Sequence, residues 1–206
     1  MRAIARIAFS GCGRQRFHDG GVASLAVVDH GVAAVRRHDR ADALPAFTME
    51  KNVQLMLRHG VFTRQEMAAR QDIYMENYCH VLHIEAMTMI DMVQHLILNA
   101  ASHYSACLCR TITHKREAIA GISVKVEEAL AQSIAHLNEQ LLEQTAALKS
   151  AVELAPAGTG AETLRYYHDA IAERMKSVRA IADQLETLTA SDFWPYPTYC
   201  DLLFSV

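Results

Sequence analysis

The sequence predicts an all-α protein, built either as a long-helix bundle or as an extended helical hairpin. Helix breakers are rare, because no proline lies between Pro45 and Pro156 and no glycine between Gly60 and Gly121. Apolar residues recur every three or four positions over many turns between these breaks, which is the period of an amphipathic helix. Hydrophobic residues make up 51% of the chain and charged residues 21%. This balance is typical of an ordinary soluble globular domain.

The N-terminal segment differs in composition from the rest. The first 49 residues contain no Lys and no Glu, but seven Arg and four Asp. The change near Asp42 divides the chain into an atypical arm, residues 1–41, and a helical domain, residues 42–206. Either the arm is a small separate element, with a short strand at 22–28, or it is a segment that was never selected to fold with the rest of the chain. The composition favours the second interpretation.

Two helices are expected at the start of the domain. Thr48 is predicted to cap a short helix that runs to Arg58 and is stopped by Gly60. Thr63 and Glu66 have the spacing of a capping box, in which the side chain of each residue accepts a hydrogen bond from the backbone N–H of the other. A new, longer helix is therefore expected to begin at this box.

The longer helix carries one apolar stripe with a single charged member, Glu85. The stripe consists of Tyr74, Tyr78, Leu82, Glu85, Met89, Met92, Leu96, Ala100 and Tyr104. A carboxylate in an apolar stripe needs a partner or a raised pKa. Glu85 is therefore either a catalytic or regulatory acid or, as we prefer, one half of a structural contact with an Arg of a neighbouring helix. Met87, Met89 and Met92 are expected to fill the core.

Two further helices form the predicted hairpin. The first carries Leu130, Ile134, Leu137, Leu141 and Leu148 at helical spacing. The run Pro156-Ala157-Gly158-Thr159-Gly160 then breaks the chain sharply. The last helix carries Leu164, Tyr167, Ile171, Met175, Val178, Ile181, Leu185 and Leu188, and it is expected to end near Ser191.

The C-terminal tail is aromatic and contains two prolines, so it is not helical throughout and is too apolar to remain in water. We expect it to pack back onto the helices or onto a partner. Its predicted structural or interface residues are Trp194, Pro195, Pro197, Tyr199, Leu202, Leu203 and Phe204.

Three stretches of sequence carry a family resemblance. They are EKNV at 50–53 with HGVFT at 59–63, then IEAMTMIDM at 84–92, and finally WPYPTYCDLLF at 194–204. In order and spacing they resemble the segments that follow the catalytic domain of type III glutamine synthetases. The resemblance covers about residues 42–206, and it adds Glu85 and Asp91 to the expected structural or interface residues.

The resemblance implies an all-helical C-terminal part that serves oligomerisation or scaffolding. The family joins ammonia to glutamate at the expense of ATP, in large homo-oligomers. Its ATP site and its Mg or Mn ligands lie in the catalytic domain, whose motifs are not found in this chain. We therefore expect no cofactor and no activity from the chain alone. The expected partner is a second copy or the catalytic domain of a glutamine synthetase.

Two other functions are compatible with the sequence. The chain could be an unrelated helical interaction module, or a metal- or haem-binding four-helix bundle that uses its histidines and cysteines. The second alternative ranks last, because there is no CxxC pair and no HExxH.

Charge and cysteine content indicate the compartment and the partners. The formal net charge is −3, so no nucleic-acid partner is expected. Five scattered cysteines suit free thiols in the cytoplasm better than a disulfide framework. Glu85, Asp91 and His95 interrupt the apolar runs, so no membrane span is expected.

Overall fold

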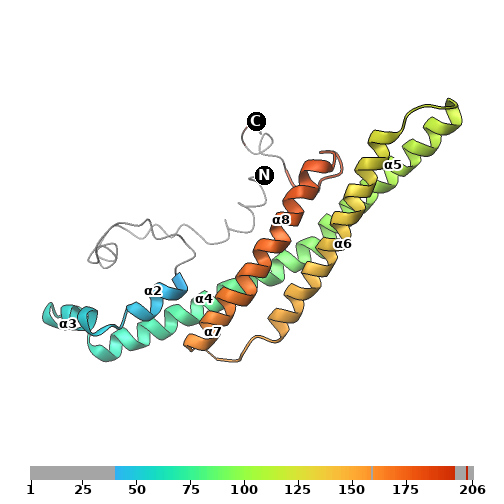
Figure 1. Ribbon diagram of the computed structural model, residues 1–206. Coiled ribbons are helices and arrows are strands. Elements are labelled where there is room, and N and C mark those ends of the chain that lie inside the picture. Colours follow the sequence, from blue (N-terminus) through green and yellow to red (C-terminus); the bar gives the residue numbers. More distant parts are fainter. Residues whose placement is uncertain (1–39, 159, 198–202, 204–206) are drawn as a thin grey trace.

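The computed structural model describes residues 40–158, 160–197 and 203, and in this part of the chain it is helical without strands. The predicted all-α class is confirmed. Residues 1–39 of the predicted arm at 1–41, with its hypothetical strand at 22–28, lie outside the described residues. The helices form an elongated rod, in which a long hairpin is joined by a third helix along part of its length (Figure 1).

The N-terminal end contains two short helices, α2 (Arg40–Ala46) and α3 (Glu50–Arg58). Helix α2 packs against the main bundle, since Ala41 is 5% exposed and belongs to the large core. The expected boundary at residue 42 therefore falls inside a helix that packs with the domain.

The predicted cap of α3 is wrong by one residue. Met49 occupies the N-cap position, without a side-chain hydrogen bond. Thr48 instead donates its hydroxyl hydrogen bond to the side-chain oxygen of Gln71, over 2.9 Å, and so ties the turn to the next helix. The predicted stop is confirmed, because Gly60 has a φ of +63°, a left-handed conformation that favours glycine.

The backbone of the rod is one continuous helix, Arg64–Ala118, of 55 residues. It comprises α4 (Arg64–Met92), the π-helical segment η2 (Val93–Ile97) and α5 (Leu98–Ala118). At a rise of 1.5 Å per residue its length is about 80 Å. The predicted capping box is confirmed: Glu66 N donates to Thr63 Oγ1 over 3.2 Å, and Thr63 N donates to Glu66 Oε2 over 2.8 Å.

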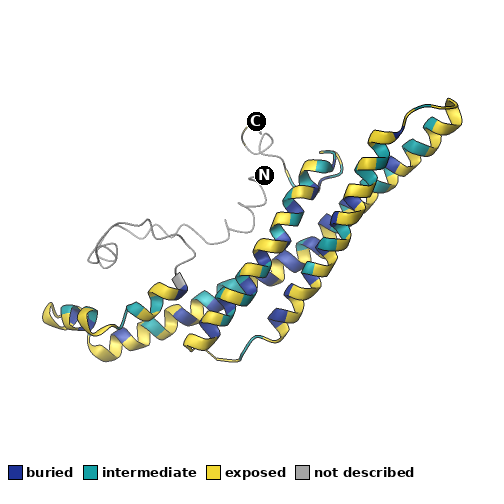
Figure 2. Cartoon of the chain, in the orientation of Figure 1, coloured by how far each residue is buried: buried dark blue, intermediate teal, exposed yellow. Residues whose placement is uncertain are grey.

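The chain then reverses and returns as α6 (Lys125–Glu153), which packs along α5 and forms the hairpin. After a loop at 154–160 the third helix follows, made of α7 (Ala161–Tyr166), η3 (Tyr167–Ala172) and α8 (Glu173–Leu188). The predicted break between Pro156 and Gly160 and the two apolar stripes that flank it are confirmed. The large core lies between the three helices, as the dark blue inner faces in Figure 2 show.

The predicted stripe on the long helix is rotated relative to the one that is buried. The buried residues of this helix are Met67, Met75, Cys79, Ala86, Met89, Ile90, Val93, Ile97, Ala101 and Leu108. Tyr74 and Leu96 of the predicted stripe are 41% and 44% exposed, and Met87, expected in the core, is 48% exposed. The reason is that this helix contacts both α6 and the α7–η3–α8 helix, so its buried sector lies between these two neighbours.

Candidate interaction surface

The C-terminal tail begins by packing onto the bundle. The Phe193 ring lies against Tyr104 of α5, with ring centroids 5.3 Å apart. Trp194 is 8% exposed within the large core, and its ring contacts that of Tyr196 edge-on, with centroids 6.3 Å apart. Its backbone N–H donates to the Ala190 carbonyl over 3.2 Å, which holds the turn after α8. The start of the tail is therefore part of the fold.

The remaining tail residues from the sequence analysis are less buried or are not described. Pro195 and Pro197 are exposed, and Leu203 is 55% exposed. Tyr199, Leu202 and Phe204 lie outside the described residues. The interface role of this whole set stays a prediction.

Tyr196 connects the tail to Asp91, another residue singled out in the sequence. Burial, and secondarily the negative charge of Asp91, raise the pKa of the Tyr196 phenol to about 12. Its hydroxyl oxygen and Trp194 Nε1 are both buried without a hydrogen-bond partner. Burying an unpaired polar group is costly, so the tail is held by apolar packing rather than by its polar atoms.

Glu85 is half-buried on α4 and takes part in a polar or electrostatic interaction. The predicted arginine partner stays a prediction. On the same helix His83 is half-buried, and its Nδ1 lies 3.3 Å from the hydroxyl oxygen of Tyr167 at the start of η3. Burial also raises the pKa of the Cys79 thiol and of the Tyr167 phenol. These groups are held in their neutral forms, which is the opposite of an activated nucleophile.

A shallow groove lies between the long helix and the C-terminal part of α6. Its volume is about 210 Å³, and it is lined by Met87, Ile90, Asp91, Gln94, Lys149, Val152 and Glu153. Met87, Ile90 and Val152 are the apolar residues of its lining, while Asp91, Lys149 and Glu153 supply charges. Asp91 is 73% exposed and pairs with His95 on its own helix, over 3.5 Å.

An exposed seam runs along the outer face of α4 into this groove. Its members follow one another at alternating steps of four and three residues: Ile73, Asn77, His80, Ile84, Met87, Asp91 and Gln94. All are exposed. The mean step of 3.5 residues keeps them on one side of a helix that turns every 3.6 residues, and it is the spacing of a coiled-coil seam. Sequence reasoning missed the seam, because four of its seven members are polar.

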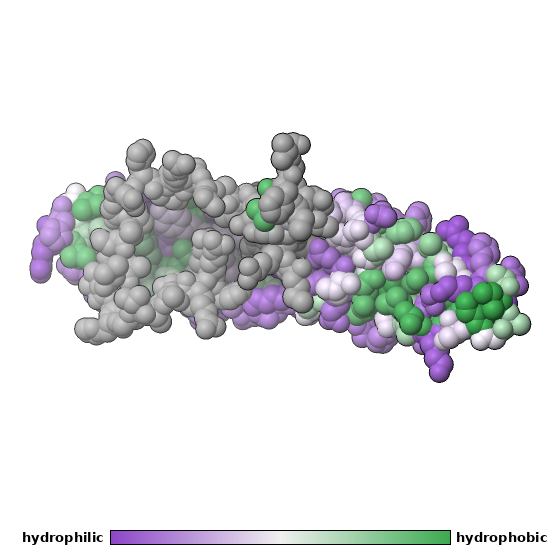
Figure 3. Space-filling model, turned by 90° about the horizontal axis from the view of Figure 1, so that it is seen from above, coloured by the Kyte–Doolittle hydropathy of each residue, from purple (hydrophilic) through white to green (hydrophobic). Residues whose placement is uncertain are grey.

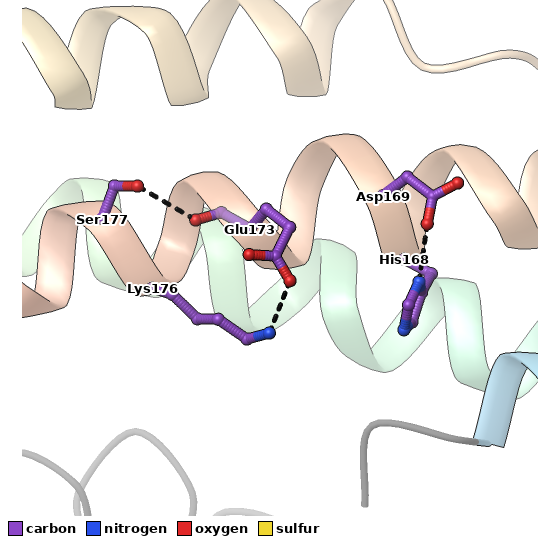
Figure 4. Close-up of polar contacts among 5 residues, drawn as sticks. All are labelled: His168, Asp169, Glu173, Lys176 and Ser177. Carbon is purple, nitrogen blue, oxygen red and sulfur yellow. Dashed lines mark hydrogen bonds and ion pairs between the residues drawn. The ribbon is translucent and has the colours of Figure 1, made fainter.

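The outer face of η3 and α8 carries ordinary surface pairs (Figure 4). His168 Nδ1 lies 2.7 Å from Asp169 Oδ1, and Lys176 Nζ donates to Glu173 Oε1. Ser177 donates its hydroxyl hydrogen bond to the Glu173 carbonyl over 3.2 Å, which is a contact within one helix. Exposed pairs of this kind contribute little to stability and resemble no catalytic arrangement.

The far end of the hairpin also exposes apolar side chains, and Figure 3 shows apolar surface towards that end of the molecule. Ile119 and Val126, on either side of the reversal between α5 and α6, are 58% and 68% exposed. Within the described residues no three His, Cys, Asp or Glu side chains gather as they would around a metal ion.

By length and composition alone, the long helix is apolar enough to cross a membrane. The sequence-based expectation that Glu85, Asp91 and His95 rule out a membrane span is therefore wrong by this test. In its most apolar window 28% of the residues are buried inside the structure. Length and composition are weak evidence, because the core helix of a soluble bundle passes the same test.

Comparison with known proteins shows which family this chain is similar to. Residues 34–116 match the family model described as the glutamine synthetase C-terminal domain. A glutamine synthetase of Butyrivibrio fibrisolvens is 29% identical over 166 residues, and a type-3 glutamine synthetase of Dictyostelium discoideum is 25% identical over 186 residues. The chain is similar to the C-terminal domain of glutamine synthetases, and one of the similar proteins is a type-3 enzyme.

The extent of the match is as informative as its identity. The alignments cover 80% and 79% of this chain, but 24% and 23% of the two relatives. A glutamine synthetase of Bacteroides fragilis gives a similar result, 22% identity over 80% of this chain and 23% of its own length. The chain thus spans about a quarter of the length of the curated relatives it matches. The family match begins at residue 34, so it extends into the segment that composition assigned to a separate arm.

Proposed function

We propose that this chain forms the C-terminal helical part of a type III glutamine synthetase and acts there in oligomerisation and scaffolding. The observation that carries the proposal is the coverage: about four fifths of the chain matches only about a quarter of each relative. Two of the three sequence motifs that resemble the family, at 50–63 and at 84–92, lie within residues 34–116, which match the family model. An unrelated helical interaction module would not share this match.

The shape of the described residues supports a scaffolding role. A rod built on a continuous 55-residue helix exposes long faces relative to its volume, and these faces can contact other subunits. Its groove of about 210 Å³ between α4 and α6 is shallow. We assign ATP, Mg or Mn and the joining of ammonia to glutamate to the catalytic region of the complete enzyme. The present chain then helps the subunits of the enzyme to assemble in the cytoplasm. Its partner there is a second copy of the chain or the catalytic region.

A domain replacement tests the proposal. In the Butyrivibrio relative, the segment aligned with this chain is replaced by residues 40–206, and particle mass and glutamine formation are measured. A version without any such segment is the negative control, and the Dictyostelium segment in the same place is the positive control. The expected result is assembly and activity like those of the positive control. If the chimera behaves like the deletion while the Dictyostelium segment works, the proposal is wrong.

The 206-residue chain alone allows a second test. It is expected to form no glutamine and to bind no ATP specifically. Turnover above that of a mock preparation would contradict the assignment of the chemistry to another region.

A further inference from the structure

Within the described part of the chain the seam on α4 is exposed, and it has the spacing of a helix–helix interface. In the single chain Ile84 is 52% exposed and Met87 is 48% exposed, at the middle of the seam. Taking apolar area of this kind out of water drives association. The polar members His80 and Asp91 lie on either side of this apolar centre, and Asn77 and Gln94 lie beyond them.

The order of these side chains makes the seam complementary to itself in one antiparallel register. When two copies are related by a two-fold axis midway between residues 84 and 87, Ile84 faces the partner's Met87. In the same register His80 faces the partner's Asp91, and Asn77 faces the partner's Gln94. An apolar pair, an acid–imidazole pair and an amide pair thus follow one another outward, and the symmetry makes each of them twice.

We propose that two copies of this chain pair through this seam, antiparallel, with the two-fold axis between Ile84 and Met87. The pairing rests on the proposed scaffolding function and names the partner of that surface as a second copy. The seam residues alternate between the a and d positions of a heptad. In this register each a residue faces a d residue of the partner, as in antiparallel coiled coils.

The groove beside the seam fits this register. Asp91 and Gln94 line it together with Lys149 and Glu153 of α6. In the pair, the partner's His80 and Asn77 lie opposite Asp91 and Gln94, at the mouth of the groove. The imidazole there meets two carboxylates, those of Asp91 and Glu153, so the polar ends of the seam are hydrogen-bonded rather than merely desolvated. Discrimination against other registers follows, because a slip of one heptad places Ile84 opposite His80 or Gln94, both of which are polar.

The test measures the dimerisation of the 206-residue chain by sedimentation equilibrium over a range of protein concentrations. The unmodified chain is expected to populate a dimer whose fraction rises with concentration. Ile84→Glu places a charge in the apolar centre twice, so the dissociation constant of the dimer should rise by at least about 100-fold. Leu96→Glu, an equally drastic change on the same helix but off the seam, should leave the constant within about threefold. Far-ultraviolet circular dichroism of both variants checks that the helices are retained.

A charge exchange tests the register itself. Asp91→Lys and His80→Glu should each weaken the dimer by about tenfold, while the double variant should recover most of the loss, because the two residues meet across the axis. Asp72→Lys, the same substitution at an exposed position off the seam, is the control. Asp91 also influences Tyr196 of the tail, but an effect through the tail would not be reversed by His80→Glu.

Three results would overturn the pairing: a monomer at every concentration, a dimer that Ile84→Glu does not weaken, or single charge variants that the double variant does not rescue. The second of these assigns the contact to another surface. A chain that is monomeric alone, but whose Ile84→Glu version fails to assemble in the chimera, would identify the catalytic region as the occupant of the seam. The chimera can succeed while the pairing fails, so the two proposals fall separately.

Discussion

The ring of Phe193 packs against the ring of Tyr104, with centroids 5.3 Å apart and the planes inclined by 48°. This contact joins the segment after α8 to the middle of α5, and it places the next residue, Trp194, in the core. The first turn of the tail is therefore an element of the bundle, and its removal should be felt by the helices.

Replacing Trp194 by Ala should lower the free energy of unfolding by about 3–5 kcal/mol, the usual cost of emptying a buried aromatic position. Trp194→Phe keeps much of the packing and should cost less than half as much. Urea unfolding must be followed by circular dichroism, because Trp194 is the one tryptophan of the chain and its fluorescence disappears with it. A loss below about 1 kcal/mol would contradict a core role for this side chain.

Tyr196 should make the protein sensitive to alkali. Its folded pKa is raised to about 12, while an unfolded tyrosine ionises near a pKa of about 10. The stability that it contributes is fully present below pH about 10 and is lost as the pH rises through about 12. Between pH 10 and 12 the melting temperature of the Tyr196→Phe variant should therefore fall less than that of the unmodified chain. At pH 7 the variant should be unchanged or slightly stabilised, since the buried hydroxyl has no hydrogen-bond partner.

Helix α2 should matter to the stability of the domain. Deleting residues 1–46 removes Ala41 from the core and the Leu44 carbonyl that accepts a 2.9 Å hydrogen bond from Gln71 Nε2. The melting temperature should then lie at least about 4 °C below that of a chain lacking residues 1–39. Equal melting temperatures for the two truncations would show that α2 contributes nothing.

The capping box should hold the first turn of the long helix. Thr63→Ala should cost about 1 kcal/mol, and it should speed amide hydrogen exchange at residues 64–67. Thr88→Ala is the control, since Thr88 is exposed in the middle of α4 and its hydroxyl bonds only to its own helix, at Ile84 O. The box also lowers the pKa of Glu66, first through the backbone N–H of Thr63 and second through its hydroxyl, which donates to Glu66 Oε2. Alanine keeps the N–H but removes the hydroxyl, so the effect of Thr63→Ala should be present while Glu66 is ionised and shrink as the pH falls through its lowered pKa.

The sequence by itself determined the helices of this protein and their breaks. The run without proline, the glycine at 60, the box at Thr63 and the loop at 154–160 act locally, within a few residues, and so they can be read from the chain. The stripes of α6 and of the last helix were also predicted correctly, because strongly apolar residues such as Leu141 and Ile171 dominate a single face. The family followed from motifs of the same local kind.

Only the tertiary structure decided which side of the long helix is buried. The helical period shows that an apolar stripe exists, but its phase depends on the neighbours, and this helix has two. The burial of Met75 and Cys79 in place of Tyr74, the docking of α2 through Ala41 and the contact of Phe193 with Tyr104 all join residues far apart in the sequence. The seam through Ile84 and Met87 became visible for the same reason, since a side chain is known to be free for a partner only after the fold has left it exposed.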